Sequence, residues 1–470
     1  MKLHNTLTKR IDELRPIHDK NVGIYSCGPT LYDRVHIGNL NSFIIADMLR
    51  RAISAEGKHV LHVMNFTDVD DKTIRASKEK FPNLDPMESL LSLTKEFRDS
   101  FMADMTAVGN SLKDISFVSA TDCIEDMQNL ITDLFKMGYA YVADDGVYFS
   151  IEAYKESGKK YGQLLDISAA STSQARIQND EYDKESVHDF ALWKKQKDGE
   201  PAWEFTLDEQ DLTGRPGWHI ECSAMSNKLL GDEFDIHTGG VDLVFPHHEN
   251  EIAQSTALSQ SHIYANAFMH NEHLLVDGRK MSKSLNNFFT LQDLLDKGFD
   301  ALSFRMLVLQ SHYRNQANFS WESLEAAQNR LKDYRSLAVL RFQARDQVFD
   351  AGTVSLQDVV SEISTFMSND LDTPKALAFL SEVSTQLQTV QISKEMLPGF
   401  EAMIKGIDDL LGLDLMKLTD IAASQKQMII EREQARANKD WAKSDQLRDN
   451  LLDQGIELRD TGSGTVWSIQ

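Results

Sequence analysis

The segment 21–68 has a strand–helix–strand pattern, and this feature constrains the fold more than any other. Residues 21–26 form an apolar run that predicts a buried strand, which Cys-Gly-Pro-Thr at 27–30 interrupts. A helix is predicted from about Asn41 to Ser54, and the alternation from His59 to Phe66 predicts a second strand. Together they form a βαβ unit, in which ligands bind at the carboxyl ends of the strands. Three residues are expected at that edge: Cys27, His36 and Thr67.

The rest of the chain adds helices and one irregular segment. Residues 143–200 are charged and irregular, which favours an insertion between two halves of a nucleotide-binding sheet. The order Asp372-Thr373-Pro374 predicts a helix start, because a capping residue precedes proline in the first turn. Residues 419–470 predict a basic helix followed by a short β-like tail. Further helical spacing is found over Pro86–Met105, Asp122–Met137 and His247–Ser259, and from Trp321 onward.

Length and composition predict a multidomain globular protein. A chain of 470 residues is expected to contain about three domains, and 41% hydrophobic residues with mixed charge are typical of a soluble protein. No apolar run approaches the roughly 20 residues that span a bilayer, and the N-terminus lacks an apolar signal core. We therefore expect no membrane contact and a cytoplasmic location. The odd number of cysteines, three, favours a reducing compartment.

The net charge of −23 argues against a generic nucleic-acid-binding protein, since such proteins are usually basic. It does not exclude binding of one particular RNA, because a local basic stripe matters more than the total charge.

Two short strings far apart in the chain suit a triphosphate. His36-Ile37-Gly38-Asn39 opens the predicted helix, and Lys280-Met281-Ser282-Lys283-Ser284 is a basic loop flanked by serines. Together they offer an imidazole, a glycine backbone at a helix start and two lysines. The second string alone would be interpreted as a solvated basic turn, so the prediction depends on the pair.

A third set of residues suits a metal ion. His247 and Glu251 are four residues apart and share one face of a helix, so they can bind one ion. Adding Cys222 and the distant Cys27 gives sulfur, sulfur, nitrogen and oxygen ligands, which suit zinc better than magnesium or calcium. His248 is the competing nitrogen, but on a helix it points about 100° away from His247. The alternatives are a polar helix start at the surface and buried cysteines of the core.

These strings resemble the "HIGH" and "KMSKS" signatures of class I aminoacyl-tRNA synthetases, and the whole chain resembles the cysteinyl-tRNA synthetase family. The pairing of GWHIECS at 217–223 with FPHHENEIAQS at 245–255 carries most of the specificity. One departure is Asn39, where the signature has histidine; asparagine can still donate a hydrogen bond to phosphate or ribose. The other matching strings are YSCGPT at 25–30, NFTDVDDK at 65–72, DIH at 235–237, KDWA at 439–442 and TVW at 465–467.

The resemblance implies an α/β Rossmann-type class I catalytic core with an insertion, followed by a helical bundle and a small C-terminal anticodon-binding domain. It also implies zinc on Cys27, Cys222, His247 and Glu251, one ion per chain, and a monomer. The expected boundaries are 1–120 and 206–270 for the two core halves, 121–205 for the insertion, 271–318 for the KMSKS region, 319–415 for the bundle and 416–470 for the anticodon-binding domain.

The implied activity is the ATP-dependent ligation of L-cysteine to tRNA(Cys) through a cysteinyl-adenylate, with Mg²⁺ accompanying ATP. Zinc would bind the thiolate of the substrate cysteine as an additional ligand. The hydroxyl of serine is a far weaker ligand because it stays protonated. The implied catalytic residues are His36, Asn39, Lys280 and Lys283. ATP would also contact Gly38, Gly240 and Asp242, with Asp242 suited to a ribose hydroxyl. The cysteine pocket would be lined by Thr67, Trp218 and His237.

The C-terminal segment is expected to read the anticodon. Its cations are spaced four, three and four residues apart and predict a basic helical stripe that contacts phosphates: Arg432, Arg436, Lys439 and Lys443. The alternative is a solvated face paired with acidic neighbours. Trp441 is expected to pack, whereas Trp467 could either pack or stack on a base.

Three other functions compete. A cysteine ligase that transfers cysteine to an amino sugar would share the zinc and phosphate motifs, but it would not need the C-terminal tail. A non-catalytic tRNA-binding paralogue would be free to lose the motif residues, all of which are present. A class I synthetase for another amino acid, such as methionine, gives no reason for the four metal ligands to occur together.

Overall fold

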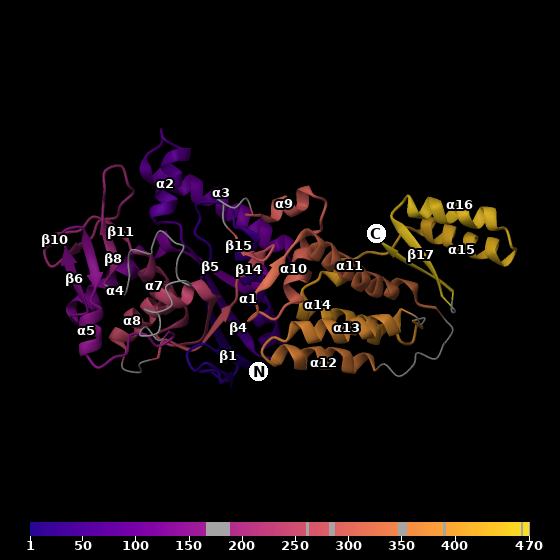
Figure 1. Ribbon diagram of the computed structural model, residues 1–470, viewed down its shortest axis with the longest axis horizontal. Helices are drawn as coiled ribbons and strands as arrows, with labels where there is room; N and C mark the ends of the chain where they lie inside the picture. The colour runs from indigo at the N-terminus through magenta and orange to yellow at the C-terminus, as the bar shows by residue number, and fades with distance from the viewer. Residues whose placement is uncertain are drawn as a thin grey trace. The chain divides into compact units, whose positions relative to one another are not determined.

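The computed structural model describes residues 1–165, 189–259, 263–281, 287–345, 355–388, 392–461 and 464–469 (Figure 1). The chain divides into two compact units, of which the first is Met1–Leu275, Lys280–Leu291 and Tyr313–Gln316. The second is Val276–Arg279, Gln292–His312 and Ala317–Gln470. Among the described residues, no helix has the length and apolar character needed to cross a bilayer.

The first unit is built on a five-stranded parallel sheet with the order β13-β12-β3-β4-β5. The predicted strands are confirmed, because β3 spans Asn21–Ser26 and β4 spans His59–Phe66. The chain leaves β3 in one direction through β4 and β5, and later returns to the other side of β3 with β12. The carboxyl ends of β3 and β12 therefore flank a topological switch point, where α/β sheets bind ligands. The other strands are β5 (Ile115–Ser119), β12 (Phe234–Gly240) and β13 (Ala265–Asn271).

Helix α1 (Ile37–Ala55) connects β3 to β4 and begins earlier than the predicted Asn41. The reason is the cap: the His36 side chain accepts a hydrogen bond from the Asn39 backbone, and the Asn39 side chain accepts one from the His36 backbone. This reciprocal capping box satisfies two N–H groups at the helix start. The remaining helices of the parallel core are α2 (Asp71–Lys80), α3 (Pro86–Ala107), α4 (Ile124–Lys136), α7 (Trp218–Leu230) and α8 (Glu249–Leu258).

The expectation of an irregular segment over 143–200 is wrong where the structure describes it. Its described residues contain β7, α5 and β8, and the two strands belong to a four-stranded antiparallel sheet with the order β11-β8-β7-β6, in which Trp193 of β8 is fully buried. Its strands are short and separated in sequence, so no long alternating pattern announces them. The elements of this region are β6 (Ala140–Ala143), β7 (Gly146–Phe149), α5 (Ile151–Glu156), β8 (Phe190–Lys195), β9 (Thr206–Leu207), β10 (Gln210–Asp211) and β11 (Gly214–Pro216).

Short elements complete the first unit and lead out of it. The N-terminal hairpin consists of β1 (Lys2–Asn5) and β2 (Arg10–Glu13), which pair antiparallel. A short helical turn, Val244–His248, kinked at Phe245, precedes α8. The others are the 3₁₀ turns Leu112–Asp114, Ala120–Cys123 and Val241–Leu243, with the strands β14 (Leu274–Val276) and β15 (Arg279–Lys280).

The second unit is mostly helical, as predicted from Trp321 onward, and α12, α13 and α14 pack side by side (Figure 1). The predicted helix start at Asp372 is confirmed, because its side chain accepts from the Lys375 backbone and proline occupies the first turn of α13. The elements are α9 (Leu291–Asp296), α10 (Ala301–Leu309), β16 (Ala317–Phe319), α11 (Trp321–Ala338), a 3₁₀ turn (Val339–Gln343), α12 (Leu356–Ser368), α13 (Thr373–Leu387), α14 (Leu397–Leu411) and a 3₁₀ turn (Leu415–Lys417).

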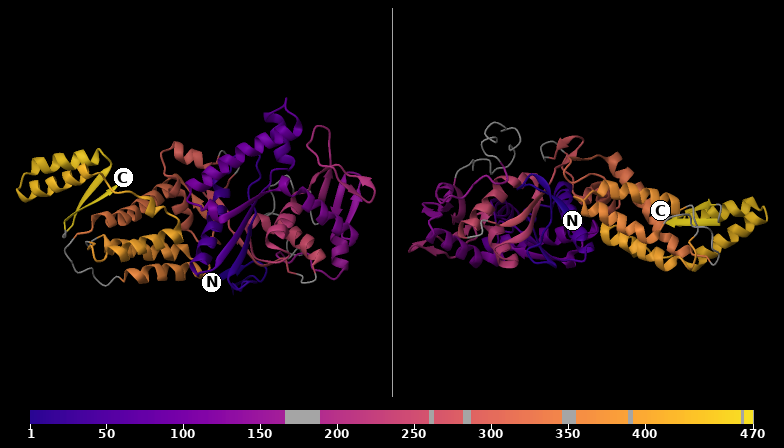
Figure 2. Two further views of the ribbon diagram at one scale, coloured as in Figure 1. Left: turned by 180° about the vertical axis from the view of Figure 1, so that it is seen from behind. Right: turned by 90° about the horizontal axis from the view of Figure 1, so that it is seen from below.

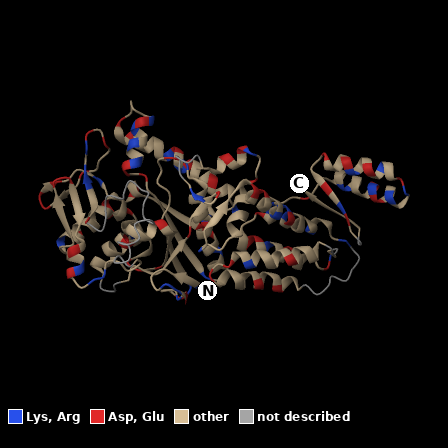
Figure 3. Cartoon of the chain, viewed as in Figure 1, with Lys and Arg blue, Asp and Glu red and all other residues tan. Residues whose placement is uncertain are grey.

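The C-terminal segment differs from its prediction. Instead of one basic helix it has two, α15 (Ala423–Ala437) and α16 (Trp441–Leu452), followed by a hairpin of β17 (Ile456–Thr461) and β18 (Gly464–Ile469) (Figure 2). The chain turns between the helices at Lys439, whose φ of 61° lies in the left-handed region and ends the helix. Figure 3 shows basic and acidic residues mixed along both helices.

Candidate active site

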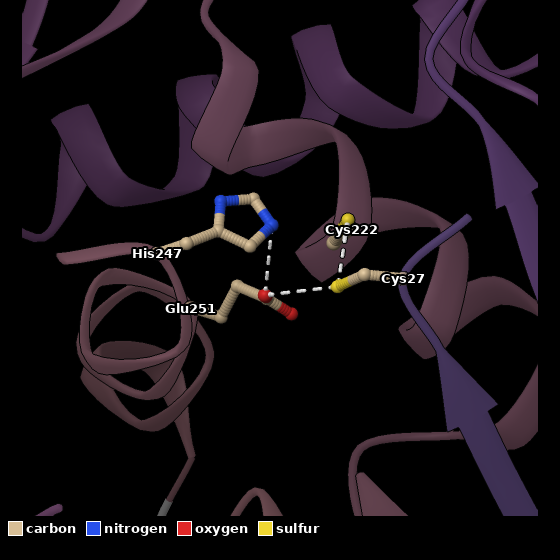
Figure 4. Close-up of side chains that lie close together, drawn as sticks. All are labelled: Cys27, Cys222, His247 and Glu251. Carbon is tan, nitrogen blue, oxygen red and sulfur yellow. Dashed lines mark hydrogen bonds and ion pairs between the residues drawn. The ribbon is translucent and has the colours of Figure 1, made fainter. Parts of the chain in front are cut away.

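The predicted metal ligands come together at the switch point of the parallel sheet (Figure 4). Cys27 follows β3, Cys222 lies in α7, His247 lies in the kinked turn before α8 and Glu251 lies in α8. The two Sγ atoms are 3.9 Å apart, and the Nε2 atom of His247 is 3.1 Å from Oε1 of Glu251. All four ligand atoms lie within 4.8 Å of one another. This group can hold a metal ion.

Neighbouring side chains occupy the outward-facing atoms of two ligands. The Nδ1 atom of His247 is 3.0 Å from Nδ1 of His219, whereas its Nε2 has no hydrogen-bond partner among the described residues. On Glu251, Oε2 lies 2.8 Å from Nε2 of His237 and accepts from the Tyr264 hydroxyl at 2.9 Å. Each ligand thus presents one remaining atom to the centre, Nε2 of His247 and Oε1 of Glu251. Metal sites are commonly oriented by such outer partners.

The expectation that His248 points away from the ligands is wrong. Its Nε2 lies 3.4 Å from Sγ of Cys27, because the strand end that carries Cys27 packs beside the His248 ring. A second possible ligand group therefore consists of Cys27, His237, His248 and Glu251. It holds one thiol instead of two, and Nε2 of His237 already contacts Glu251 Oε2 at 2.8 Å. The group with both thiols is the better site for a soft cation.

Burial sets the charge state of this cluster. It raises the pKa of the Cys27 and Cys222 thiols and lowers the pKa of His247 to about 3, which leaves the imidazole neutral. Burial also acts to raise the pKa of Glu251, but His237 and His247 hold it below its ordinary value. A neutral imidazole and an ionised carboxylate are the forms that bind a metal, and a cation would favour loss of the thiol protons.

The two phosphate motifs meet at the start of α1. The backbone N–H of Ile37 donates to the Phe289 carbonyl at 2.9 Å, and the His36 ring packs edge-on against Phe288 at 4.9 Å. A Cβ on Gly38 would lie 2.4 Å from the Met281 methyl carbon, so only glycine allows this side chain to rest on the helix start. Residues on both sides of the basic loop are therefore held beside the first motif.

The lysines and the expected adenosine contacts are placed as follows. Lys280 is exposed, and its carbonyl accepts from the Asn287 side chain at 3.1 Å, whereas Lys283 lies outside the described residues. Gly240 ends β12, and Asp242 follows in a 3₁₀ turn, 3.9 Å from the ring of His273. Both are near the carboxyl end of the sheet, where a nucleotide is expected.

Of the three residues expected to line the cysteine pocket, two contact predicted metal ligands. The Trp218 ring stacks on His247 at 4.0 Å with 17° between the planes, and His237 is fully buried beside Glu251. Thr67, at the end of β4, donates to Oε2 of Glu221 at 3.0 Å. No role was predicted for four supporting residues, His219, Glu221, Tyr264 and His270, the last of which has its Nε2 atom 2.8 Å from Nδ1 of His248. His219 and Glu221 lie inside the GWHIECS string, so the matched residues beside them could have indicated a role for both. Tyr264 and His270 lie outside every matched string.

The residues expected to contact tRNA do not form one stripe. Arg432 and Arg436 lie on α15, Lys439 lies in the turn and Lys443 lies on α16, so the single-helix stripe is a wrong prediction. Arg432 is 3% exposed and donates from both terminal nitrogens to Asp460 at 2.9 Å.

Of the two tryptophans, Trp467 takes one of its two expected alternatives, whereas Trp441 differs from its prediction. Trp467 belongs to the apolar core of the segment and stacks on Phe342. The packing expected for Trp441 is wrong, because the ring is 56% exposed, with the Arg436 guanidinium 5.9 Å from its centre.

Comparisons with known proteins agree with this geometry. A family model for the class I (C) tRNA synthetase catalytic domain matches residues 13–329, and a cysteinyl-tRNA ligase anticodon binding domain model matches residues 418–467. A cysteine–tRNA ligase of Brachyspira hyodysenteriae is 38% identical, covering 99% of this chain and 98% of its own. One of Chlamydia muridarum is 39% identical, covering 98% of each.

Solved structures resemble the fold at low sequence identity. A Mycobacterium tuberculosis methionyl-tRNA synthetase in complex with methionyl-adenylate has a TM-score of 0.57 at 13% identity, covering 86% of this chain and 95% of its own. Fold and motifs together define a class I aminoacyl-tRNA synthetase. Within that class, the matches along the whole chain are specific, and the chain belongs to the cysteine–tRNA ligase family.

Proposed function

We propose that the chain joins L-cysteine to tRNA(Cys) at the expense of ATP, through a cysteinyl-adenylate. The observation that carries the proposal is the cluster of Cys27, Cys222, His247 and Glu251 at the end of the sheet, beside the phosphate motif at His36. Full-length similarity to cysteine–tRNA ligases supports it. The monomeric state and the cytoplasmic location stay predictions.

Zinc fits the ligand set better than other common ions. Two sulfurs, one imidazole nitrogen and one carboxylate oxygen suit it, and Nε2 of His247 is buried and without a hydrogen-bond partner among the described residues. Bound zinc would act as a soft Lewis acid that binds the substrate thiolate. The hydroxyl of serine would be a much weaker ligand for it. A site built for one polar group can reject its analogue by roughly 10⁴-fold, so no editing domain is required.

The protein positions the remaining reactants. The cysteine carboxylate is already a nucleophile, so attack on the α-phosphate needs no general base, and catalysis is mostly alignment and charge stabilisation. His36 and the start of α1 would face the phosphates, with Asn39 fixing the His36 ring through the capping box. Lys280 and Lys283 would hold the departing pyrophosphate together with Mg²⁺. Gly240 and Asp242 would contact the adenosine.

The pocket for the amino acid would be formed by Thr67, Trp218 and His237. Two of these side chains lie beside metal ligands, and Thr67 lies beside Glu221, the residue before Cys222. The tRNA would be read by the C-terminal segment, where we now favour Arg436, Lys439 and Lys443 as direct contacts. Arg432 and Trp467 would support that surface from within.

The experiment that tests the proposal is charging of a tRNA(Cys) transcript with labelled cysteine and ATP. We expect acid-precipitable cysteinyl-tRNA with this transcript and none with a serine-specific tRNA. Cysteine-dependent AMP release without charging, but with an amino sugar present, would favour the amino-sugar ligase. No cysteine-dependent reaction from folded, zinc-loaded protein would overturn the enzymatic proposal and favour the tRNA-binding paralogue.

A further inference from the structure

A chain of buried hydrogen bonds connects the segments that carry the two cysteine ligands. The backbone N–H of Gly28, next to Cys27, donates to Oδ1 of Asn65 at 2.8 Å. The Asn65 amide donates to Oγ1 of Thr67 at 3.2 Å, and that hydroxyl donates to Oε2 of Glu221 at 3.0 Å. Glu221 precedes Cys222 in α7.

These groups are sealed from solvent, so their hydrogen bonds have little competition from water. Asn65 is 1% exposed, Thr67 is 2% exposed and Glu221 is fully buried. A Cβ on Gly28 would lie 1.8 Å from the Asn65 carbonyl oxygen, so glycine is required for the backbone at residue 28 to approach Asn65 and form this hydrogen bond. Buried polar side chains that are held on several sides are rigid, which is what a recognition site requires.

The direction of the hydrogen bonds determines what the Thr67 hydroxyl can still do. A hydroxyl has one proton to donate and two lone pairs. Thr67 gives its proton to Glu221 and uses one lone pair for the Asn65 amide. One lone pair remains, so the hydroxyl can serve an additional partner only as an acceptor. Oε2 of Glu221 accepts this proton both in the carboxylate and in the carboxylic acid that carries its own proton on Oε1.

We propose that Glu221, with Asn65, is a positioning residue that fixes the Thr67 hydroxyl as an acceptor for the ammonium group of the substrate amino acid. The inference rests on the proposed function, in which Thr67 lines the cysteine pocket. The ammonium is the donor group of the substrate at neutral pH, and its carboxylate offers only acceptors. Oε1 of Glu221 has no hydrogen-bond partner among the described residues, so the hydrogen bond from Thr67 to Oε2 is the side-chain contact that uses this carboxyl group.

The test compares two ligands that differ only in the amino group. Cysteine and 3-mercaptopropionate share the thiol and the carboxylate, so the metal contact is common to both. Calorimetric binding to zinc-loaded protein is measured for the wild type, Thr67→Val, Thr67→Ser, Glu221→Met and Glu221→Gln. The glutamine variant restores an acceptor for the Thr67 proton at the same length, whereas methionine fills the space without one.

We expect Thr67→Val and Glu221→Met to weaken cysteine binding roughly tenfold or more, with 3-mercaptopropionate changed by less than about twofold. Thr67→Ser and Glu221→Gln should restore most of the cysteine affinity. Asn110→Leu is the matched control, because Asn110 is a buried amide bonded to the Phe43 carbonyl, outside this hydrogen-bond chain. That variant should not distinguish the two ligands.

Equal weakening of both ligands in Glu221→Met would overturn the inference, because it would mean a general structural role. Unchanged cysteine affinity in Thr67→Val would overturn it as well. Neither result touches the proposed function, which fails only if zinc-loaded wild-type protein binds no cysteine and does not catalyse cysteine-dependent exchange of pyrophosphate into ATP.

Discussion

At the scale of single residues, the site depends on side chains that hold the ligands rather than on the ligands alone. Oε2 of Glu251 is engaged by His237 and Tyr264, and Nδ1 of His247 lies against His219. Because these contacts occupy the outer atoms, the inner atoms converge without rearrangement, which lowers the cost of binding an ion.

Removing one outer partner should weaken metal binding. Tyr264→Phe deletes the hydroxyl that donates to Glu251 at 2.9 Å, and we expect zinc affinity to fall roughly 10- to 100-fold. Competition with a chromophoric chelator measures this directly. Tyr154→Phe is the control, because Tyr154 is equally buried but bonds Thr256 instead of a ligand. Equal losses in both variants would contradict the assignment.

Buried His62 makes the stability of the folded state depend on pH. Burial, with a smaller contribution from Arg50, lowers the pKa of His62 from 6.5 to about 4. Between these values the unfolded chain binds the proton and the folded chain does not. The contribution of His62 to the free energy of unfolding is therefore complete above pH 6.5 and is lost as the pH falls toward 4. Between pH 7 and pH 5 the free energy of unfolding should decrease by about 2 kcal/mol through this group.

His62→Gln removes this titration. We expect the unfolding midpoint of the variant to fall less between pH 7 and pH 5 than that of the wild type, as measured by thermal melting at both pH values. An identical fall in both proteins would show that His62 does not titrate in this range.

At the scale of elements, the start of α1 combines a structural and a chemical role in His36. Its side chain caps the helix, and its ring lies where the phosphates are expected. His36→Ser keeps a capping oxygen and removes the imidazole, whereas His36→Ala removes both. We expect both variants to lose roughly 10²- to 10³-fold in pyrophosphate exchange, and only the alanine variant to lose about 1 kcal/mol of stability. Exchange activity retained by His36→Ser would mean that capping is the whole role.

Helix α15 is joined to the terminal hairpin by the ion pair of buried Arg432 with Asp460. Arg432 is buried and bonds both oxygens of Asp460, while Arg436 is part-exposed beside Trp441. Arg432→Ala should therefore destabilise the C-terminal segment by about 2 kcal/mol, seen as a lower melting temperature. Arg436→Ala should leave melting nearly unchanged and raise the KM for tRNA. A normal melting temperature in Arg432→Ala with loss of charging would instead indicate a direct phosphate contact.

At the scale of the whole molecule, the sequence predicted what is encoded in continuous patterns. The strands 21–26 and 59–66, the helical second unit and the metal ligands follow from periodicity, spacing and family strings. The antiparallel sheet of the insertion was missed because its strands are only three to six residues long and their partners are remote. The contact of His248 with Cys27 and the burial of Arg432 were missed because each depends on a residue distant in the sequence, Cys27 in the first case and Asp460 in the second.

The side chains that contact the outer atoms of the predicted metal ligands could not be predicted from the sequence. Tyr264 reaches Glu251 from the residue before β13, and no pattern in its own segment indicates that contact. Such residues become visible only when the fold brings distant segments together.

The most direct test of the account is amino-acid-dependent exchange of pyrophosphate into ATP, measured with cysteine and serine alongside zinc content. We predict one zinc per chain, with cysteine preferred over serine by roughly 10⁴-fold. Cys222→Ala should lose both zinc and exchange, whereas Cys123→Ala, which changes a buried cysteine outside the ligand group, should keep both. Exchange with serine at a comparable rate in the zinc-loaded protein would contradict the central claim that the metal selects the thiolate.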